Sequence, residues 1–185
     1  MTEFLINLDG NILLWIQDFL RNDVLTPFFT FITSLGNGGT IWIIFTAILI
    51  FYPKTRKIGL MCACALIFSH IVNNTLLKNL VCRTRPFDNI PALTPLIERP
   101  SSFSFPSGHT ASSFTCAWVL FKKLPKKLGV PAILLAALIG FSRLYLGVHY
   151  PSDVLAGMLG GILMSCLAFV FVEKIAASGN RCKGY

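Results

Sequence analysis

Two of the three histidines in this chain have neighbours that suit phosphoryl transfer. His109 follows the run Phe105-Pro106-Ser107-Gly108, and His149 precedes Asp153 by four residues. One imidazole can attack phosphorus while the other donates a proton to the leaving oxygen. Asp153, one helical turn past His149, can hold the second nitrogen of the nucleophile. The pairing of two histidines with an acid therefore predicts nucleophilic catalysis.

Three basic residues need an anion as their partner: Lys78, Arg85 and Arg143. Any one of them alone could extend to a lipid headgroup, but three cations directed at one place favour a bound phosphate. Ser107 and Gly108 open an apolar helix, whose free N–H groups and dipole favour negative charge. Because glycine lets the backbone approach an anion closely, this turn is predicted to complete a phosphate cradle.

A metal site is the competing interpretation, because His109, His149 and Asp153 could ligate zinc or another divalent ion. The three cations would repel such an ion in the same pocket. They also supply the charge stabilisation that a phosphoryl transition state requires. We therefore expect neither a metal nor another cofactor.

Taken together, these residues resemble the type 2 phosphatidic acid phosphatase superfamily, which also includes the vanadium haloperoxidases. Three segments carry the resemblance: Lys78, six residues and Arg85-Pro86; Pro106-Ser107-Gly108-His109; and Ser142-Arg143, five residues, His149, three residues and Asp153. The resemblance covers roughly residues 58–172.

The resemblance implies a role for each of these residues. His149 would be the nucleophile that becomes phosphohistidine, Asp153 its orienting partner, and His109 the acid for the leaving group. The phosphate would be bound by Lys78, Arg85, Ser107, Gly108 and Arg143. Members of the family act without a metal.

Substrate and function class follow from the same resemblance. The bacterial integral members resemble phosphatases for undecaprenyl diphosphate, phosphatidylglycerophosphate, phosphatidate and lipid A. We expect undecaprenyl diphosphate here, with phosphatidylglycerophosphate or phosphatidic acid as the alternative. A membrane transporter is the alternative from another class. The vanadium enzymes are largely soluble, so the hydrophobicity of this chain argues against a haloperoxidase.

The elements that must position these residues are apolar. Hydrophobic residues make up 54% of the 185 positions and charged residues 13%, which is typical of a membrane protein. Because lipid cannot satisfy backbone polar groups, we predict an all-α polytopic bundle. The six cysteines are scattered, so no disulfide framework is expected.

Ten basic residues lie in three clusters that flank apolar runs, as expected of cytoplasmic loops. The clusters are Lys54, Arg56 and Lys57; Lys122, Lys123, Lys126 and Lys127; and Lys174, Arg181 and Lys183. This distribution argues against nucleic acid as a partner, although the formal net charge is +8.

The predicted elements begin with an amphipathic helix at the membrane surface over residues 4–20 and a shallow helix over 24–35. A break is expected at Gly36-Asn37-Gly38-Gly39. Five spans follow, at about 40–52, 58–80, 107–121, 130–148 and 152–172, and a sixth in the N-terminal stretch is possible. We thus divide the chain into N-terminal interfacial and shallow helices, 1–37, and a membrane phosphatase core, 38–185.

This topology sends every candidate site residue to the same outer ends of the helices. We therefore expect a multi-pass protein of the bacterial plasma membrane with its site on the extracytoplasmic face. Its partners would be membrane lipids and a lipid phosphate or diphosphate substrate, and its oligomeric state is left open.

Two further features lie near this outer end. His70, Asn74 and Lys78 form a polar stripe on one helix face, which either bonds neighbouring helices or lines a wet path to the site. The loop from Cys82 to Phe105 carries Arg83 and Arg99 and is expected to shape access for the headgroup.

Overall fold

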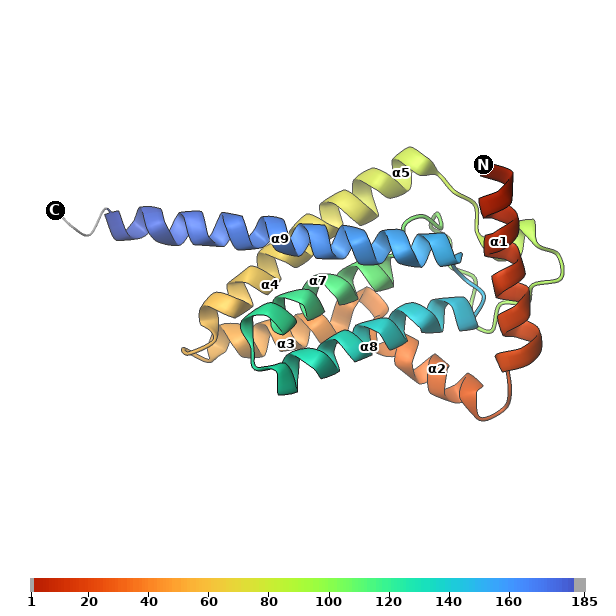
Figure 1. Ribbon diagram of the computed structural model, residues 1–185, viewed down its shortest axis with the longest axis horizontal. Helices are drawn as coiled ribbons and strands as arrows, with labels where there is room; N and C mark the ends of the chain where they lie inside the picture. The colour runs from red at the N-terminus through yellow and green to blue at the C-terminus, as the bar shows by residue number, and fades with distance from the viewer. Residues whose placement is uncertain (1, 182–185) are drawn as a thin grey trace.

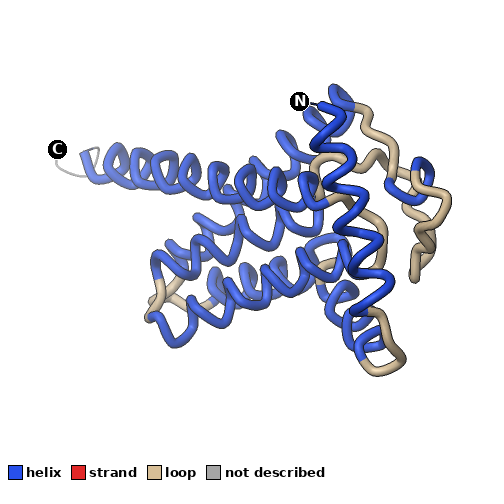
Figure 2. Tube along the Cα trace, turned by 45° about the vertical axis from the view of Figure 1, so that its right-hand side comes forward, coloured by secondary structure: helices blue, strands red, loops and turns tan. Residues whose placement is uncertain are grey.

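The computed structural model describes the backbone of residues 2–181 and the side chains of residues 6–178. Every regular element in these ranges is helical (Figure 2), which confirms the predicted all-α class. The helices are α1 (Thr2–Trp15), η1 (Ile16–Leu20), α2 (Leu25–Leu35), η2 (Asn37–Gly39), α3 (Thr40–Phe51), α4 (Arg56–Ser69), η3 (His70–Leu77), α5 (Lys78–Val81), α6 (Pro86–Asn89), α7 (Gly108–Lys123), α8 (Lys126–Tyr145) and α9 (Pro151–Arg181).

Helix α7 forms the centre of the bundle, with α4, α8 and α9 packed against it. Figure 1 shows these helices running alongside one another, with α9 extending beyond the others. The core around α7 contains fully buried side chains from several helices, including Trp42, Ala117, Val119 and Ile139. Large apolar side chains such as Leu134 and Leu159 are exposed on the outside, as expected of helices that face lipid.

Membrane spans were predicted at five places. By length and composition, three helical stretches can cross a membrane: Arg56–Asn89, Lys126–Tyr145 and Pro151–Ser178. The pair Leu25–Leu35 and Asn37–Phe51, bent by 45°, counts as a fourth. The remaining predicted span is α7, which has only 16 residues and is largely buried by its neighbours.

The bend between α2 and α3 lies where the glycine run predicts it. Gly38 and Gly39 have φ of 59° and 73°, a left-handed conformation that few other residues adopt without strain. The helix therefore stops and restarts here, and Asn37 is placed at the break.

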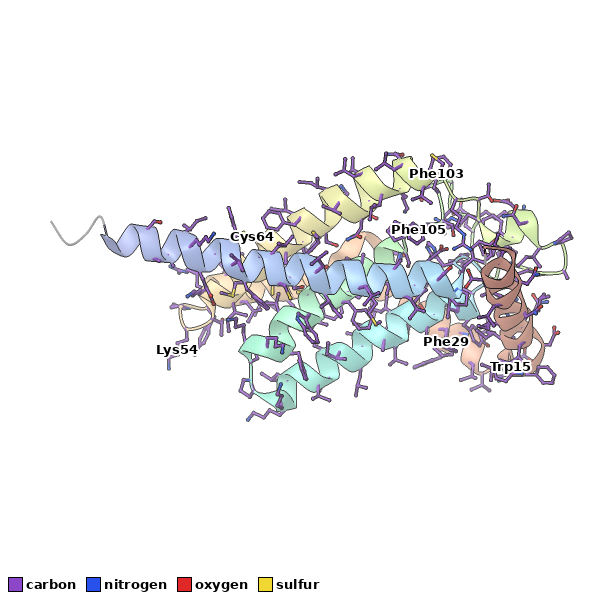
Figure 3. All side chains as sticks on the ribbon, turned by 45° about the horizontal axis from the view of Figure 1, so that its top comes forward. Trp15, Phe29, Lys54, Cys64, Phe103 and Phe105 are labelled. Atoms are coloured by element: carbon purple, nitrogen blue, oxygen red, sulfur yellow. The ribbon has the colours of Figure 1, made fainter. Side chains whose placement is uncertain are left out.

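Helix α1 crosses the end of the bundle at which α9 begins, as Figure 1 shows. We call this the site end. The loops gather there in Figure 2, and Figure 3 places Phe103 and Phe105 at it and Lys54 at the opposite end. The first two basic clusters lie at the turns α3–α4 and α7–α8. In the third cluster, Lys183 and the side chain of Arg181 lie outside the described residues.

Helices α7 and α9 pack closely because of glycine. A Cβ added at Gly157 would lie 2.6 Å from the carbonyl oxygen of Ser107, so no larger residue fits without a shift. The close approach lets the Ser107 N–H donate to the carbonyl of Asp153 at 3.0 Å. The two helix starts that carry the predicted site residues are thereby joined.

The predicted domain boundary at residue 37 stays a prediction. Contacts cross it in the structure, since Arg143 donates a hydrogen bond of 2.5 Å to Thr33 Oγ1. Asp9 of α1 is also buried against the start of α9.

Candidate active site

One cavity of about 1090 Å³ collects most of the predicted site residues. Its lining includes Lys78, Arg85, Gly108, His109, Arg143 and His149. The two remaining candidates, Ser107 and Asp153, are fully buried and do not line the cavity. Five separate segments, spread over 76 positions, thus meet as the topology predicts.

The polar stripe of the second predicted span faces this cavity. His70, Asn74 and Lys78 all line it, and Asn74 packs against the start of α7. A Cβ added at Gly108 would lie 2.5 Å from Asn74 Oδ1, so a larger residue there would displace the Asn74 side chain.

His149 lies in the turn between α8 and α9, where its side chain is 2% exposed. Its Nδ1 lies 3.4 Å from Asp153 Oδ2. The same oxygen accepts hydrogen bonds from Ser104 Oγ at 2.5 Å and from the Tyr150 N–H at 3.0 Å. The carboxylate that orients His149 is therefore itself fixed by several donors.

Arg85 determines which nitrogen of His149 carries the proton. Its Nη1 lies 3.2 Å from His149 Nε2 and also donates to the Val148 carbonyl at 2.7 Å. Because a guanidinium only donates, Nε2 must accept and the proton must lie on Nδ1, facing Asp153. His149 thus presents an unprotonated nitrogen toward the cavity, as a nucleophile requires.

Burial and, to a smaller extent, the positive charges of Arg85 and Arg143 lower the pKa of His149, which is about 3. The hydrogen bond with Asp153 acts in the opposite direction. The imidazole is therefore neutral at physiological pH, which keeps its lone pair available.

Two more cations face the cavity with spare donors. Arg143 is 3% exposed, and its buried Nε has no hydrogen-bond partner within the described part of the chain. Among the described residues, Lys78 Nζ donates to Ser102 Oγ at 3.4 Å and to no other side chain. Because an unpaired buried donor is costly, Arg143 Nε is suited to an incoming anion, and the Lys78 ammonium has further donors to offer one.

His109 lies in the first turn of α7 and has a different environment. Its Nε2 lies 2.9 Å from Asn37 Oδ1, which belongs to the glycine break between α2 and α3. An amide oxygen can only accept, so in this assignment Nε2 carries the proton. That proton points at Asn37, which lines the cavity together with His109.

Ser107 caps α7, since its Oγ accepts hydrogen bonds from the N–H and Oγ1 of Thr110. Its own N–H is taken by the carbonyl of Asp153. Of the predicted cradle, the N–H groups of Gly108 and His109, two residues that line the cavity, therefore remain for phosphate, whereas Ser107 is buried behind them.

Sequence reasoning missed four residues that complete this arrangement: Asp9, Arg83, Asn37 and Ser104. Arg83 donates to Asp153 Oδ1 at 2.7 Å and to Asp9 Oδ2 at 2.8 Å. A signal existed only for Arg83, as a basic residue two positions before Arg85. Among the described residues, no group of three or more His, Cys, Asp or Glu side chains could hold a metal ion.

Known proteins are similar to this chain in sequence and fold. The PAP2 superfamily matches residues 58–176. An undecaprenyl-diphosphatase of Sulfolobus acidocaldarius is 36% identical over 128 residues, which cover 69% of this chain and 62% of that relative. The chain thus spans less than two thirds of that relative's length.

Two solved structures extend the comparison. The crystal structure of a transmembrane PAP2-type phosphatidylglycerolphosphate phosphatase from Bacillus subtilis has a TM-score of 0.73 and 34% identity. It covers 91% of this chain and 86% of its own. A bacterial vanadium-dependent iodoperoxidase, with a TM-score of 0.60 and 19% identity over 71% of this chain and 38% of its own, shares the fold.

Proposed function

Because this chain belongs to the PAP2 superfamily, a metal-independent family of phosphatases, we propose that it hydrolyses a lipid phosphate or diphosphate through a phosphohistidine at His149. The observation that carries the proposal is the neutral Nε2 of His149, directed at a cavity lined by three cations. A nucleophile and an anion site face each other there.

The first step joins His149 to phosphorus. The phosphate binds to Lys78, Arg85 and Arg143, and Arg85 exchanges its bond to Nε2 for one to phosphate oxygen. The Nε2 lone pair attacks phosphorus as the bond to the leaving oxygen breaks. His109, which the charge of the bound phosphate keeps as an imidazolium, gives that oxygen a proton and becomes neutral. Asp153 stabilises the positive charge that develops on His149.

The second step frees the enzyme. His109, now a neutral imidazole, takes a proton from a water molecule, whose oxygen attacks the phosphohistidine. The N–P bond breaks, phosphate leaves, and both histidines return to their starting states. The same residue thus acts first as acid and then as base.

As substrate we propose undecaprenyl diphosphate, with phosphatidylglycerophosphate as the second candidate. The similarity to the Sulfolobus undecaprenyl-diphosphatase supports the first substrate, and the similarity to the Bacillus phosphatidylglycerolphosphate phosphatase supports the second. Purified protein in mixed micelles is to be assayed for phosphate release from four lipids: the two candidates, and phosphatidate and lipid A for comparison. Preferential turnover of undecaprenyl diphosphate is expected; equally low turnover of every lipid would contradict both assignments.

For this integral, multi-pass protein we propose that the site faces the extracytoplasmic side. Cys82 is exposed near the site end and is a natural probe. An impermeant thiol reagent should label it in intact cells, and Cys82→Ser should abolish that signal. A cysteine introduced at Lys54, in a Cys82→Ser background, should react only after lysis. The reverse pattern would invert the topology.

Catalysis without a metal makes a separate prediction. A chelator should leave activity unchanged, whereas vanadate, which adopts a pentacoordinate geometry like that of phosphorus in the transition state, should inhibit. Activity lost in chelator and restored by one divalent ion would support the metal interpretation instead.

A further inference from the structure

An acidic residue of the N-terminal helix lies among residues of the site end. Asp9 of α1 is 6% exposed, although its helix crosses the outside of the bundle. Its Oδ1 accepts from the N–H of Ser152 at 3.0 Å, and its Oδ2 accepts from the hydroxyl of the same residue. The first turn of α9, which carries Asp153, is therefore bonded directly to α1.

Arg83 links Asp9 to Asp153. Its Nη2 donates to Asp9 Oδ2 at 2.8 Å and its Nη1 to Asp153 Oδ1 at 2.7 Å. The guanidinium carbon lies 3.9 Å from the centre of the Tyr150 ring, which supports its plane by a cation–π contact. One flat, charged group thus bridges two carboxylates at fixed positions.

The two arginines of this segment contact opposite members of the His149–Asp153 pair. Arg85 lies at His149 Nε2, on the cavity side, while Arg83 holds the oxygen of Asp153 that does not face His149. Within the described residues, Arg83 is the cation that forms an ion pair with the buried Asp153 carboxylate, since His149 beside it is neutral. Arg83 therefore both neutralises this carboxylate and limits its rotation.

Arg83 needs a second anchor to perform this task. Its side chain is 23% exposed and long, and its bonds to Asp153 and to Ser152 Oγ, both at 2.7 Å, come from the one nitrogen Nη1. These bonds alone would leave Nη2 without a side-chain partner and the plane of the guanidinium less firmly fixed. Asp9 supplies that anchor and offsets the charge that Arg83 places beside Asp153. Asp9 is the charged group that α1 contributes to this network.

We propose that Asp9 and Arg83 are positioning residues that hold the Asp153 carboxylate, and through it His149, in the orientation for attack on phosphorus. Helix α1 is then a functional part of the active site, although it precedes the matched residues 58–176. The inference rests on the proposed phosphohistidine chemistry and adds to it a requirement for the N-terminal helix.

The alternative is that Asp9 only attaches α1 to the bundle, and the chain offers a matched control for it. Gln17 makes a second polar attachment, donating to the Ala92 carbonyl at 2.9 Å and accepting from the Thr94 N–H at 2.9 Å. These bonds join the same helical segment to the outer loop without contacting the His149–Asp153 pair. Loss of attachment alone should affect Gln17→Ala and Asp9→Asn alike.

The experiment measures single-turnover phosphoenzyme formation on the best lipid substrate, in full-length wild type, Asp9→Asn, Asp9→Glu and Gln17→Ala. Losing one charged hydrogen-bond partner should slow the maximal rate roughly 10- to 100-fold in Asp9→Asn. The substrate concentration at half-maximal rate should not change, because Lys78, Arg85 and Arg143 are intact. Asp9→Glu should recover most of the rate, and Gln17→Ala should resemble wild type.

Thermal unfolding of each variant shows whether the bundle has kept its stability. Equal rates in Asp9→Asn and wild type, or equal losses in Asp9→Asn and Gln17→Ala, would overturn the inference. Neither result would affect the proposed function, which fails only if wild type forms no phosphoenzyme or if His149→Ala still forms one. Arg83→Lys, which keeps the charge but cannot bridge both carboxylates, should lose rate as Asp9→Asn does.

Discussion

The surroundings of the two site histidines differ in how firmly they hold the imidazole. His149 is buried in a turn, bonded on one nitrogen to a fixed carboxylate and on the other to Arg85. His109 lines the cavity and has one side-chain partner, Asn37, from a break flanked by glycines. A nucleophile must meet phosphorus in one geometry, whereas the acid must serve first the leaving oxygen and then a water molecule. The difference indicates that the fold fixes the first role and leaves freedom in the second.

Replacing His149 should have the largest effect. In His149→Ala no phosphoenzyme can form, and we expect a loss of about 10⁴-fold or more in phosphate release. Added imidazole should restore part of the activity in His149→Gly, because the cavity then has space for a free nucleophile beside Asp153. Phosphate release that persists in His149→Ala would remove the distinction between the two histidines and favour transport or metal chemistry.

Replacing His109 should have a smaller effect that depends on the substrate. General acids contribute about 10²- to 10⁴-fold, and a monophosphate lipid, which expels a basic alkoxide, needs that proton most. His109→Ala should therefore lose more activity on monophosphate lipids than on diphosphate lipids, whose leaving group is a less basic phosphate ester. Phosphoenzyme formation is the step to compare. Equal losses on both substrates, with chemistry limiting the rate, would make His109 a phosphate binder.

The positions of the two site histidines and of the cations around them could be predicted from the sequence, because they depend on the spacing of residues along the chain. Residues such as Lys78, His109 and His149 lie at intervals that match a known pattern, and the topology placed them at one end of the bundle. The bend at Gly38 was also predictable, because positive φ is a local property that glycine favours.

The supporting contacts depend on packing and could not be read from spacing. Asp9 belongs to a segment whose pattern predicts an amphipathic helix at the membrane surface, and its partner Arg83 lies 74 positions away. The N–H of Ser107 was expected to face phosphate but bonds to Asp153, because α9 approaches α7 closely at Gly157. The π-helical stretches η1 and η3 likewise have no distinct local signal.

The protonation state of His149 provides a test of the comparison that does not require substrate. For an exposed imidazole with a pKa near 6.5, the neutral fraction would fall about 25-fold between pH 7 and pH 5. The lowered pKa of His149, about 3, keeps the ring neutral over that interval, since protonation requires a pH below the pKa. Nitrogen-15 histidine spectra at pH 5, assigned with His149→Gln, should show the neutral Nδ1–H form. A protonated ring at pH 5 would mean that His149 is less buried than this structure shows.

The smallest expected effect concerns Asn37, which holds His109 by a single amide oxygen. Asn37→Ala removes one neutral hydrogen bond, worth about 0.5–1.5 kcal/mol, so a loss of about 2- to 12-fold is expected. If Asn37 keeps the proton on His109 Nε2 for the leaving group, that loss should appear on monophosphate lipids and be absent in a His109→Ala background. Asn37→Asp places a negative charge beside the imidazole and should strengthen its hold on the proton, slowing transfer while leaving the shape of the site unchanged. If Asn37→Ala instead lowers activity equally on both classes of lipid, and does so in a His109→Ala background as well, Asn37 serves the packing of the glycine break. The mobility that we ascribe to the His109 side chain would then have to come from the start of α7.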